Sequence, residues 1–278
     1  MYMKKIAIQG IKGSFHDIAS HQYFEGEDIE LIECDTFEQV FEQLEQDDEV
    51  VALVAIENTI AGSLLHNYEL LRESNATIVG EHKLHIQHSL MCLPDEDWDD
   101  LQEVNSHPVA LMQCREFLKK HPKMKVVEVD DTAGAAAHIS KNNLRGHAAI
   151  CHKDAAQIYN MKVLEVGIET NKHNYTRFLV LASPKKAESL RRIDETNKCS
   201  MVFSLAHEEG SLSAILSVLS FYKLNLTKIQ SLPIIGKEWQ YLFYIDLTFS
   251  DYMRYRQAIN AIAPLTDELK ILGEYNAN

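Results

Sequence analysis

A continuous apolar run at residues 50–56 (VVALVAI) is the feature that most restricts the fold. The run has no polar face, so a strand formed here must be covered on both sides, as the central strands of parallel sheets are. Glu57, Asn58 and Thr59 follow the run directly. Ligands bind at the carboxyl ends of parallel strands, because loops and helix N-termini gather there. The sequence therefore predicts an α/β sheet with a candidate site beside these three residues.

The first part of the chain alternates predicted strands and helices. Residues 4–9 form a predicted buried strand, followed by a turn at 10–13 and a helix at 15–24. A strand at 126–129 precedes a helix that begins near Thr132 in the same way. This order is typical of a doubly wound α/β fold, and residues 178–182 supply its last strand.

A polar segment, SPKKAESLRRIDETNK, follows that strand and has the composition of a linker. Beyond it the sequence predicts a strand, a helix, two strands, a helix and a short strand, with the helices at 211–222 and 252–263. This is a βαββαβ ferredoxin-like unit. Its exposed sheet edge could pair with a second copy, so we expect a homodimer or a dimer of dimers.

Charge and cysteine content limit the partners and the compartment. Lys and Arg total 27 against 41 Asp and Glu, giving a net charge of -14, so nucleic acid is an unfavourable partner. The five cysteines form no CxxC pair and are odd in number, which fits reduced thiols. No stretch resembles a signal peptide or a membrane span, so we expect a cytoplasmic protein without a membrane partner.

Three histidines, His82, His85 and His88, suggest a metal site by their spacing. The segment is predicted as a strand, where two-residue alternation puts His85 on the face opposite the other two. Neither HExxH nor a Cys/His cluster occurs, so we expect no metal ligands here.

Several polar residues lie where helices are predicted to begin. Ser14 ends the turn GIKGS at a helix N-terminus, which could hold a carboxylate or be only a tight turn. Ser106 precedes Pro108 and is placed to cap a helix, and Asp131 with Thr132 precedes an alanine-rich helix. Capping alone would explain these residues.

Five segments in order resemble the prephenate dehydratase family over nearly the whole chain: GIKGSFHDIA, VAIENTIAGSLLHNYELL, SHPVALMQC, DDTAGAAAHIS and IETNKHNYTRF. The C-terminal unit resembles an ACT domain through EEGSLSAILSVLSFYKLNLTKIQSLP. No chorismate mutase helices precede the first residue, so the chain resembles the monofunctional type.

The resemblance implies a catalytic domain at 1–183, a linker at 184–197 and an ACT regulatory domain at 198–275. The catalytic domain should have two lobes similar to periplasmic binding proteins, one at about 1–79 plus 163–183 and the other at about 80–162, with a cleft between them. Thr176 matches the family's catalytic threonine, and Glu57, Asn58 and Gln113 fall on catalytic positions. The substrate-binding positions implied in the same way are Ser14, Thr59, Ser106, Thr132, Arg177 and Phe178.

The implied reaction converts prephenate to phenylpyruvate, water and carbon dioxide. Its driving force is aromatisation, so the enzyme needs to hold two carboxylates and donate a hydrogen bond or a proton to the departing hydroxyl, with no metal or organic cofactor. Thr176 is the expected donor. Arg177 could serve a carboxylate or form a structural ion pair.

The chain departs from the family pattern in two places. His16 replaces a common serine and is expected to face solvent or to add a cation near a carboxylate. In the ACT unit, the phenylalanine-binding motifs GALV and ESRP correspond to a segment containing Gly210, Ser211 and Leu212 and to one containing Gln230 and Ser231. Phenylalanine is the expected allosteric effector, and loss of the Glu and Arg of ESRP could change its affinity.

Two other functions remain open. Arogenate dehydratase uses the same scaffold on a substrate with an amine in place of the side-chain keto group. A noncatalytic amino-acid or keto-acid sensor is the alternative from another class, because fold alone does not fix function.

Overall fold

The computed structural model describes residues 3–277, and the chain divides into two compact units. The first contains the described residues up to Gln43, Val50–Leu64 and His82–Phe178, and the second contains Leu44–Glu49, Leu65–Glu81 and the described residues from Leu179 onward. No helix in the described part of the chain has the length and apolar character needed to cross a membrane.

The elements alternate as the sequence predicted. The strands are β1 (Lys4–Gln9), β2 (Ile29–Cys34), β3 (Val51–Asn58), β4 (Gly62–Ser63), β5 (Thr77–His85), β6 (Ser89–Cys92), β7 (Glu103–Ser106), β8 (Lys125–Glu128), β9 (His147–Cys151), β10 (Lys162–Val166), β11 (Tyr175–Ala182), β12 (Lys198–Ser204), β13 (Asn225–Pro233), β14 (Tyr241–Thr248) and β15 (Glu268–Tyr275). The helices are α1 (Phe15–Tyr23), α2 (Phe37–Gln46), α3 (Leu65–Glu73), α4 (Pro108–Gln113), α5 (Arg115–Lys120), α6 (Thr132–Asn142), α7 (Asp154–Ile158), α8 (Pro184–Leu190), α9 (Ser211–Phe221) and α10 (Tyr252–Ile262), with short 3-10 helices η1 (Trp98–Asp100) and η2 (Ala263–Leu265).

The first sheet has the strand order β2-β1-β3-β11-β5, with the short β4 paired to β3. Strand β1 pairs in parallel with both β2 and β3. Residues 51–56 of β3 are all buried, as a strand covered on both faces must be. The apolar run therefore forms the central parallel strand that the sequence predicted, and it ends at Glu57 and Asn58.

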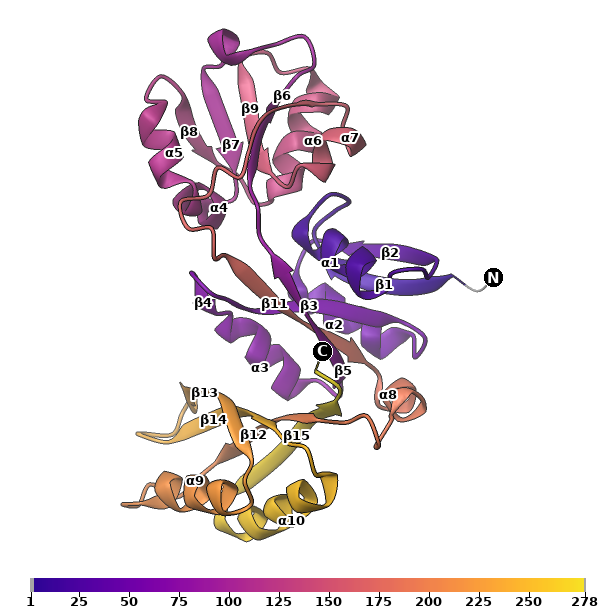
Figure 1. The fold of residues 1–278 in the computed structure, drawn as a ribbon, viewed down its shortest axis with the longest axis vertical. Helices are drawn as coiled ribbons and strands as arrows, with labels where there is room; N and C mark the ends of the chain where they lie inside the picture. The colour runs from indigo at the N-terminus through magenta and orange to yellow at the C-terminus, as the bar shows by residue number, and fades with distance from the viewer. Residues whose placement is uncertain (1–2, 278) are drawn as a thin grey trace. The chain divides into compact units, whose positions relative to one another are not determined.

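The second sheet, in the first unit, has the order β10-β6-β9-β7-β8 and is covered on both faces. Leu90 and Ile150 belong to a core shared with α4 and α5, while their neighbours Met91 and Cys151 belong to a separate core with α6 and α7. The two helix pairs lie on opposite sides of this sheet (Figure 1). Strand β10 pairs with β6 in this sheet, whereas the sequence analysis placed residues 163–166 with the other lobe.

The third sheet, in the second unit, has the order β13-β14-β12-β15, and its strands and two helices follow the ferredoxin-like βαββαβ sequence. Helices α9 and α10 cover one face (Figure 1), and Cys199, Met201 and Phe203 of β12 point into the core on that side. The fold is therefore a two-lobed α/β domain followed by an ACT-type unit. Its edge strand β13 alternates exposed and half-buried residues, and helix α8 lies inside the predicted linker.

Candidate active site

The hydroxyl of Thr176, at the start of β11, lies beside the side chain of Asn58, at the end of β3. The Asn58 amide nitrogen Nδ2 donates a hydrogen bond to Thr176 Oγ1 at 3.0 Å. A hydroxyl can donate one hydrogen bond while it accepts others. Because Thr176 Oγ1 is the acceptor here, its own proton stays available, and the residue is only half buried.

The orientation of the Asn58 amide is set by the backbone. Its oxygen Oδ1 accepts from the backbone N–H groups of Ile60 at 2.9 Å and Ala61 at 2.8 Å. A backbone N–H can only donate, so this atom must be the oxygen and the other must be the nitrogen. The nitrogen that faces Thr176 is thus fixed as a donor by the turn that follows β3.

Two further amides, Gln113 and Asn174, continue this network. Asn174 is fully buried; its Oδ1 accepts from Asn58 Nδ2 at 2.8 Å, and its Nδ2 donates to Gln113 Oε1 at 2.9 Å. Gln113 Nε2 in turn donates a hydrogen bond to Asn58 Oδ1 at 3.4 Å. The structure therefore brings the predicted residues Thr176, Asn58 and Gln113 together and adds Asn174, which the sequence analysis did not select.

His88 is a second residue that the sequence analysis did not select for this site. It lies three residues beyond the end of β5, is 2% exposed, and its Nε2 lies 2.8 Å from Gln113 Oε1. Burial lowers the pKa of this imidazole, while the Gln113 hydrogen bond and the nearby Glu169 carboxylate act in the opposite direction and His152 adds to the lowering. The three histidines do not form a cluster; His82 contacts Gln22 and His85 contacts the carbonyl of Lys172.

Glu57 and Arg177 face each other across the ends of β3 and β11. The guanidinium Nη1 lies 4.0 Å from Glu57 Oε2, and the Arg177 side chain is 10% exposed against 38% for Glu57. This distance is at the limit of an ion pair, so the two groups attract each other by charge. Both alternatives for Arg177, a substrate contact and an ion pair, remain compatible with this position.

Thr59 links the end of β3 to the start of β11 through hydrogen bonds. Its Oγ1 donates to the carbonyl of His173 at 3.0 Å and accepts from the backbone N–H of Tyr175 at 3.0 Å. Its own N–H donates to the Tyr175 carbonyl at 2.9 Å. The hydroxyl proton is used in this bridge, so the structure gives Thr59 a role in holding Thr176 in register.

Ser14 and Thr132 lie at the N-termini of α1 and α6, as predicted. Ser14 Oγ caps α1 by accepting from Asp17 N at 3.3 Å, and Asp131 Oδ1 caps α6 by accepting from Gly134 N at 2.5 Å. A Cβ added at Gly10 would lie 3.3 Å from Asp131 Oδ2 and 3.4 Å from Ser14 Oγ. The two helix N-termini therefore meet at Gly10, and burial raises the pKa of the Asp131 carboxyl.

Ser106 and Phe178 are buried in the fold. The Ser106 hydroxyl donates to the carbonyl of Ile150 at 2.5 Å, and the residue has no exposed surface. The capping prediction for Ser106 was wrong: the N-cap of α4 is His107, whose Nδ1 accepts from Val109 N at 3.2 Å. Phe178 is 1% exposed and packs edge-on against His16, with ring centroids 5.0 Å apart. Substrate contact by either residue stays a prediction.

The expectation that His16 faces solvent was also wrong. His16 is 9% exposed, and its Nε2 accepts from the backbone N–H of Ala55 at 3.3 Å. Burial lowers its pKa to about 4, so the side chain is neutral near pH 7. It cannot supply a cation for a carboxylate in this state; it packs between α1 and β3 instead.

Comparison with known proteins identifies the family. The family model for prephenate dehydratase matches residues 6–186. An Arabidopsis thaliana protein, arogenate dehydratase/prephenate dehydratase 6, is 37% identical over 98% of this chain and 68% of its own length. The chain belongs to the prephenate dehydratase family.

Solved structures agree on the fold of this prephenate dehydratase family member. The Arthrobacter aurescens prephenate dehydratase in complex with L-Phe superposes with a TM-score of 0.87 at 25% identity, covering 98% of this chain and 89% of that one. A protein described as a novel type of quorum quenching acylase superposes with a TM-score of 0.86, also at 25% identity, over 99% of this chain and 98% of its own. As a member of the family, the chain is a decarboxylating dehydratase, a carbon–oxygen lyase.

The expected effector residues of this dehydratase lie on the ACT-type unit. Gly210 precedes α9 with φ +85°, a left-handed conformation that favours glycine. Ser211 Oγ donates to the carbonyls of Ala206 and Glu208 at 3.0 and 2.8 Å, and Leu212 packs against the unit's core. Gln230 and Ser231 lie on the edge strand β13.

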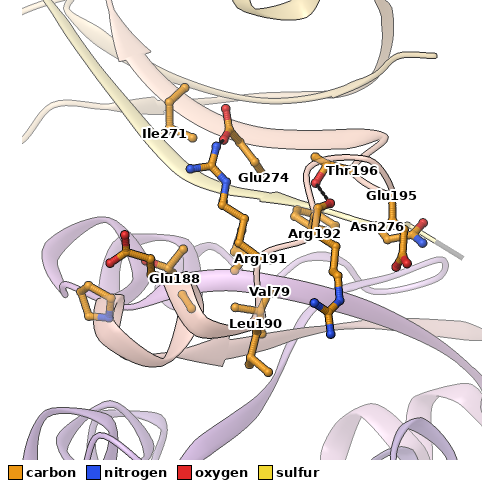
Figure 2. Close-up of a pocket in the computed structure, with 16 residues that line it drawn as sticks. Val79, Glu188, Leu190, Arg191, Arg192, Glu195, Thr196, Ile271, Glu274 and Asn276 are labelled. Atoms are coloured by element: carbon orange, nitrogen blue, oxygen red, sulfur yellow. Dashed lines mark hydrogen bonds and ion pairs between the residues drawn. The ribbon is translucent and has the colours of Figure 1, made fainter. Parts of the chain in front are cut away.

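A pocket of about 440 Å³ in the second unit contains none of the predicted site residues. It is lined by α8 and parts of β5 and β15, and Figure 2 shows Arg191 pointing toward Glu274. Glu274 also accepts from Tyr255 at 2.7 Å and from Arg256 at 3.1 Å. These contacts satisfy its carboxylate, so Glu274 and Arg191 serve the fold.

Proposed function

We propose that this enzyme converts prephenate to phenylpyruvate, with the Thr176 hydroxyl as the donor to the departing oxygen. The observation that carries the proposal is the hydrogen bond from Asn58 Nδ2 to Thr176 Oγ1, which leaves the Thr176 proton free to point at substrate. The names of the relatives support the substrate class.

The electron flow of the reaction explains why one positioned donor suffices. As the carbon–carbon bond to the ring carboxylate breaks, carbon dioxide leaves and the electron pair enters the ring, which expels the ring hydroxyl as its carbon–oxygen bond breaks. A proton that comes from solvent through the Thr176 hydroxyl converts the departing oxygen to water. Negative charge develops on the departing oxygen, where a prearranged donor stabilises the transition state more than the ground state. Asn58 polarises the threonine hydroxyl by donating to its oxygen, which strengthens the hydroxyl as a donor.

The other proposed roles follow from position. Glu57 and Arg177 stand at the same strand ends as Asn58 and Thr176, with Glu57 the more exposed. Glu57 would orient the departing hydroxyl and Arg177 would attract a carboxylate. Ser14 and Thr132 lie at the N-termini of α1 and α6 and would bind the second carboxylate, which the helix dipole of α1 favours; the first backbone N–H groups of α6 already donate to Asp131.

Replacing Thr176 tests the proposal directly. Thr176→Ala should lower kcat on prephenate about a hundredfold or more, the loss expected for one donor aimed at developing charge. Thr176→Ser, which keeps the hydroxyl, is the matched control and should retain most of the turnover. Near-normal phenylpyruvate formation by a folded Thr176→Ala variant would exclude this role.

Arogenate is the second candidate substrate, because the relatives in Arabidopsis include proteins named for both activities. The two substrates differ only in a keto group and an amine on the side chain. Comparing kcat/KM on purified prephenate and arogenate separates them. A ratio that favours arogenate would change the substrate and leave the chemistry at Thr176 unaltered.

We propose that residues 1–183 form the catalytic domain, that residues 184–197 link it to a regulatory domain at 198–275, and that phenylalanine acts through that domain. The L-Phe complex of the Arthrobacter aurescens relative and the exposed edge strand β13 support this, together with a homodimer or a dimer of dimers. Turnover measured with and without saturating phenylalanine tests this allosteric control; an unchanged rate would exclude it.

A cytoplasmic location fits the five free cysteines.

A further inference from the structure

The amide network beside Thr176 has a direction that can be followed from the backbone to His88. Asn58 Oδ1 is fixed as an acceptor by Ile60 N and Ala61 N, so Asn58 Nδ2 must donate to Asn174 Oδ1. Asn174 Nδ2 is then the donor that faces Gln113, which makes the facing Gln113 atom its oxygen, Oε1.

This direction determines the tautomer of His88. Its Nε2 lies 2.8 Å from Gln113 Oε1, an atom that can only accept, so Nε2 must carry a proton. The neutral ring then has its lone pair on Nδ1, which is buried without a hydrogen-bond partner among the described residues. A second proton on Nδ1 would therefore find no acceptor in that environment.

Two contacts besides the Gln113 hydrogen bond position His88, one to its ring and one to its backbone. Its ring stands edge-on to Phe15 of α1, with centroids 5.3 Å apart and an interplanar angle of 89°. Its backbone N–H donates to Glu169 Oε2 at 2.9 Å, and Glu169 itself is 2% exposed. Because these contacts restrict His88, its Nε2–H can restrict the orientation of the Gln113 carboxamide to which it donates.

Gln113 depends on these donors for its orientation. A free carboxamide can rotate by half a turn and exchange its oxygen and nitrogen, but the two donors that converge on Oε1 from Asn174 and His88 oppose this rotation. With Oε1 held, Gln113 Nε2 faces Asn58 Oδ1. Without His88, one donor remains, and a rotated Gln113 would place its oxygen against Asn58 Oδ1.

We propose that His88 is a positioning residue for the dehydratase reaction: its Nε2–H fixes the Gln113 carboxamide, and Gln113 with Asn58 orients the Thr176 hydroxyl toward the departing oxygen. The inference rests on the proposed role of Thr176. His88 does not contact the reacting atoms in this scheme, so its effect appears in turnover more than in substrate binding.

Three substitutions at position 88 distinguish a specific hydrogen bond from general packing. His88→Leu removes the donor and should lower kcat about tenfold to a hundredfold with KM changed less than about threefold, the pattern of a lost geometric constraint. Glutamine places its amide nitrogen near the position of imidazole Nε2, and asparagine places it near Nδ1. His88→Gln should therefore recover most of the turnover, and His88→Asn should not.

A matched control and a double-mutant cycle complete the experiment. His152→Leu removes a second imidazole that also packs on Phe15, at 5.8 Å, and should leave kcat within about twofold of wild type. In a Gln113→Leu background, His88→Leu should cause no further loss, because the group through which it acts is already absent. Thermal unfolding confirms that each variant is folded.

The outcomes separate this inference from the proposed function. Near-wild-type kcat in folded His88→Leu, equal recovery by Asn and Gln, or a full additional loss in the Gln113→Leu background would each overturn the role of His88. If Thr176→Ala keeps normal turnover, the donor role of Thr176 fails instead, whatever the variants at position 88 do. Loss in Thr176→Ala together with the pattern above supports both.

Discussion

Glu81 and Lys198 form a buried ion pair in which the lysine nitrogen reaches both carboxylate oxygens, at 2.9 and 2.8 Å. Glu81 lies on β5 and Lys198 opens β12, and their side chains are 2% and 7% exposed. The Tyr275 hydroxyl donates to the same carboxylate at 3.4 Å and lies 2.9 Å from Ser200 Oγ. Strand β12, the first strand of the ACT-type unit, is thus joined to β5 of the first sheet by buried polar side chains.

Breaking this pair should destabilise the protein strongly. Lys198→Met leaves the Glu81 carboxylate buried without its cation, so we expect the free energy of unfolding to fall by about 3–5 kcal/mol. Replacing both partners, with Glu81→Leu and Lys198→Met together, should recover much of that loss because no uncompensated charge remains. Urea denaturation followed by circular dichroism measures both effects.

An exposed ion pair provides the control for that experiment. Lys185 Nζ lies 3.1 Å from Asp48 Oδ2, and these side chains are 80% and 49% exposed. Lys185→Met should therefore change the free energy of unfolding by less than about 1 kcal/mol. If the two lysine substitutions have equal effects, burial does not determine the energy of the Glu81–Lys198 pair.

Asn58→Asp should test whether the donor that faces Thr176 matters. The new carboxylate can still accept from Ile60 N and Ala61 N, but its second oxygen would face Thr176 Oγ1 and Asn174 Oδ1 in place of a nitrogen. The Thr176 proton would then be donated to the carboxylate and withdrawn from substrate. We expect kcat to fall about a hundredfold, the scale of losing one donor to developing charge.

The pH dependence of this variant adds an independent check. Protonation at low pH restores a donor, so the deficit in kcat relative to wild type should shrink as the pH is lowered. Steady-state turnover of both proteins across the acidic range measures this, and a deficit that stays constant with pH would argue against the donor role of Asn58.

Most of the fold follows from patterns that are local in sequence. The apolar run at 50–56 became the central strand β3, and the helix predicted from Thr132 begins there as α6, because Asp131 caps it. The six elements of the ACT-type unit follow the predicted order, and its two helices begin and end within one residue of their predicted positions. Burial of one or both faces of a helix or strand produces a pattern of apolar residues that can be recognised in a single sequence.

The candidate site was less predictable because its contacts are not local. Asn58 and Asn174 are 116 residues apart in the chain, and no spacing rule links them. Asn174 stands in the same segment as Thr176, yet nothing local distinguishes it as a buried amide partner. His88 was considered only as a metal ligand; its place beyond the end of β5 and beside Gln113 depends on how α4 packs.

The buried His16 side chain should make the stability of the fold sensitive to acid. Because Ala55 N donates to His16 Nε2, protonation of that nitrogen would break a buried hydrogen bond, and burial lowers the pKa of His16 from 6.5 to about 4. The folded protein therefore binds fewer protons than the unfolded chain in this interval. Stability present above pH 6.5 should be lost as the pH falls toward about 4, by about 3 kcal/mol in total from this residue.

Comparison with His16→Gln isolates that contribution. Glutamine can accept from Ala55 N through its amide oxygen and does not titrate, so the variant should have a flatter dependence of unfolding free energy on pH. His82, His88 and His152, whose pKa values burial also lowers, remain in both proteins, so their contributions cancel in the difference. Parallel pH profiles for the two proteins, measured by urea denaturation, would show that folding does not lower the pKa of His16.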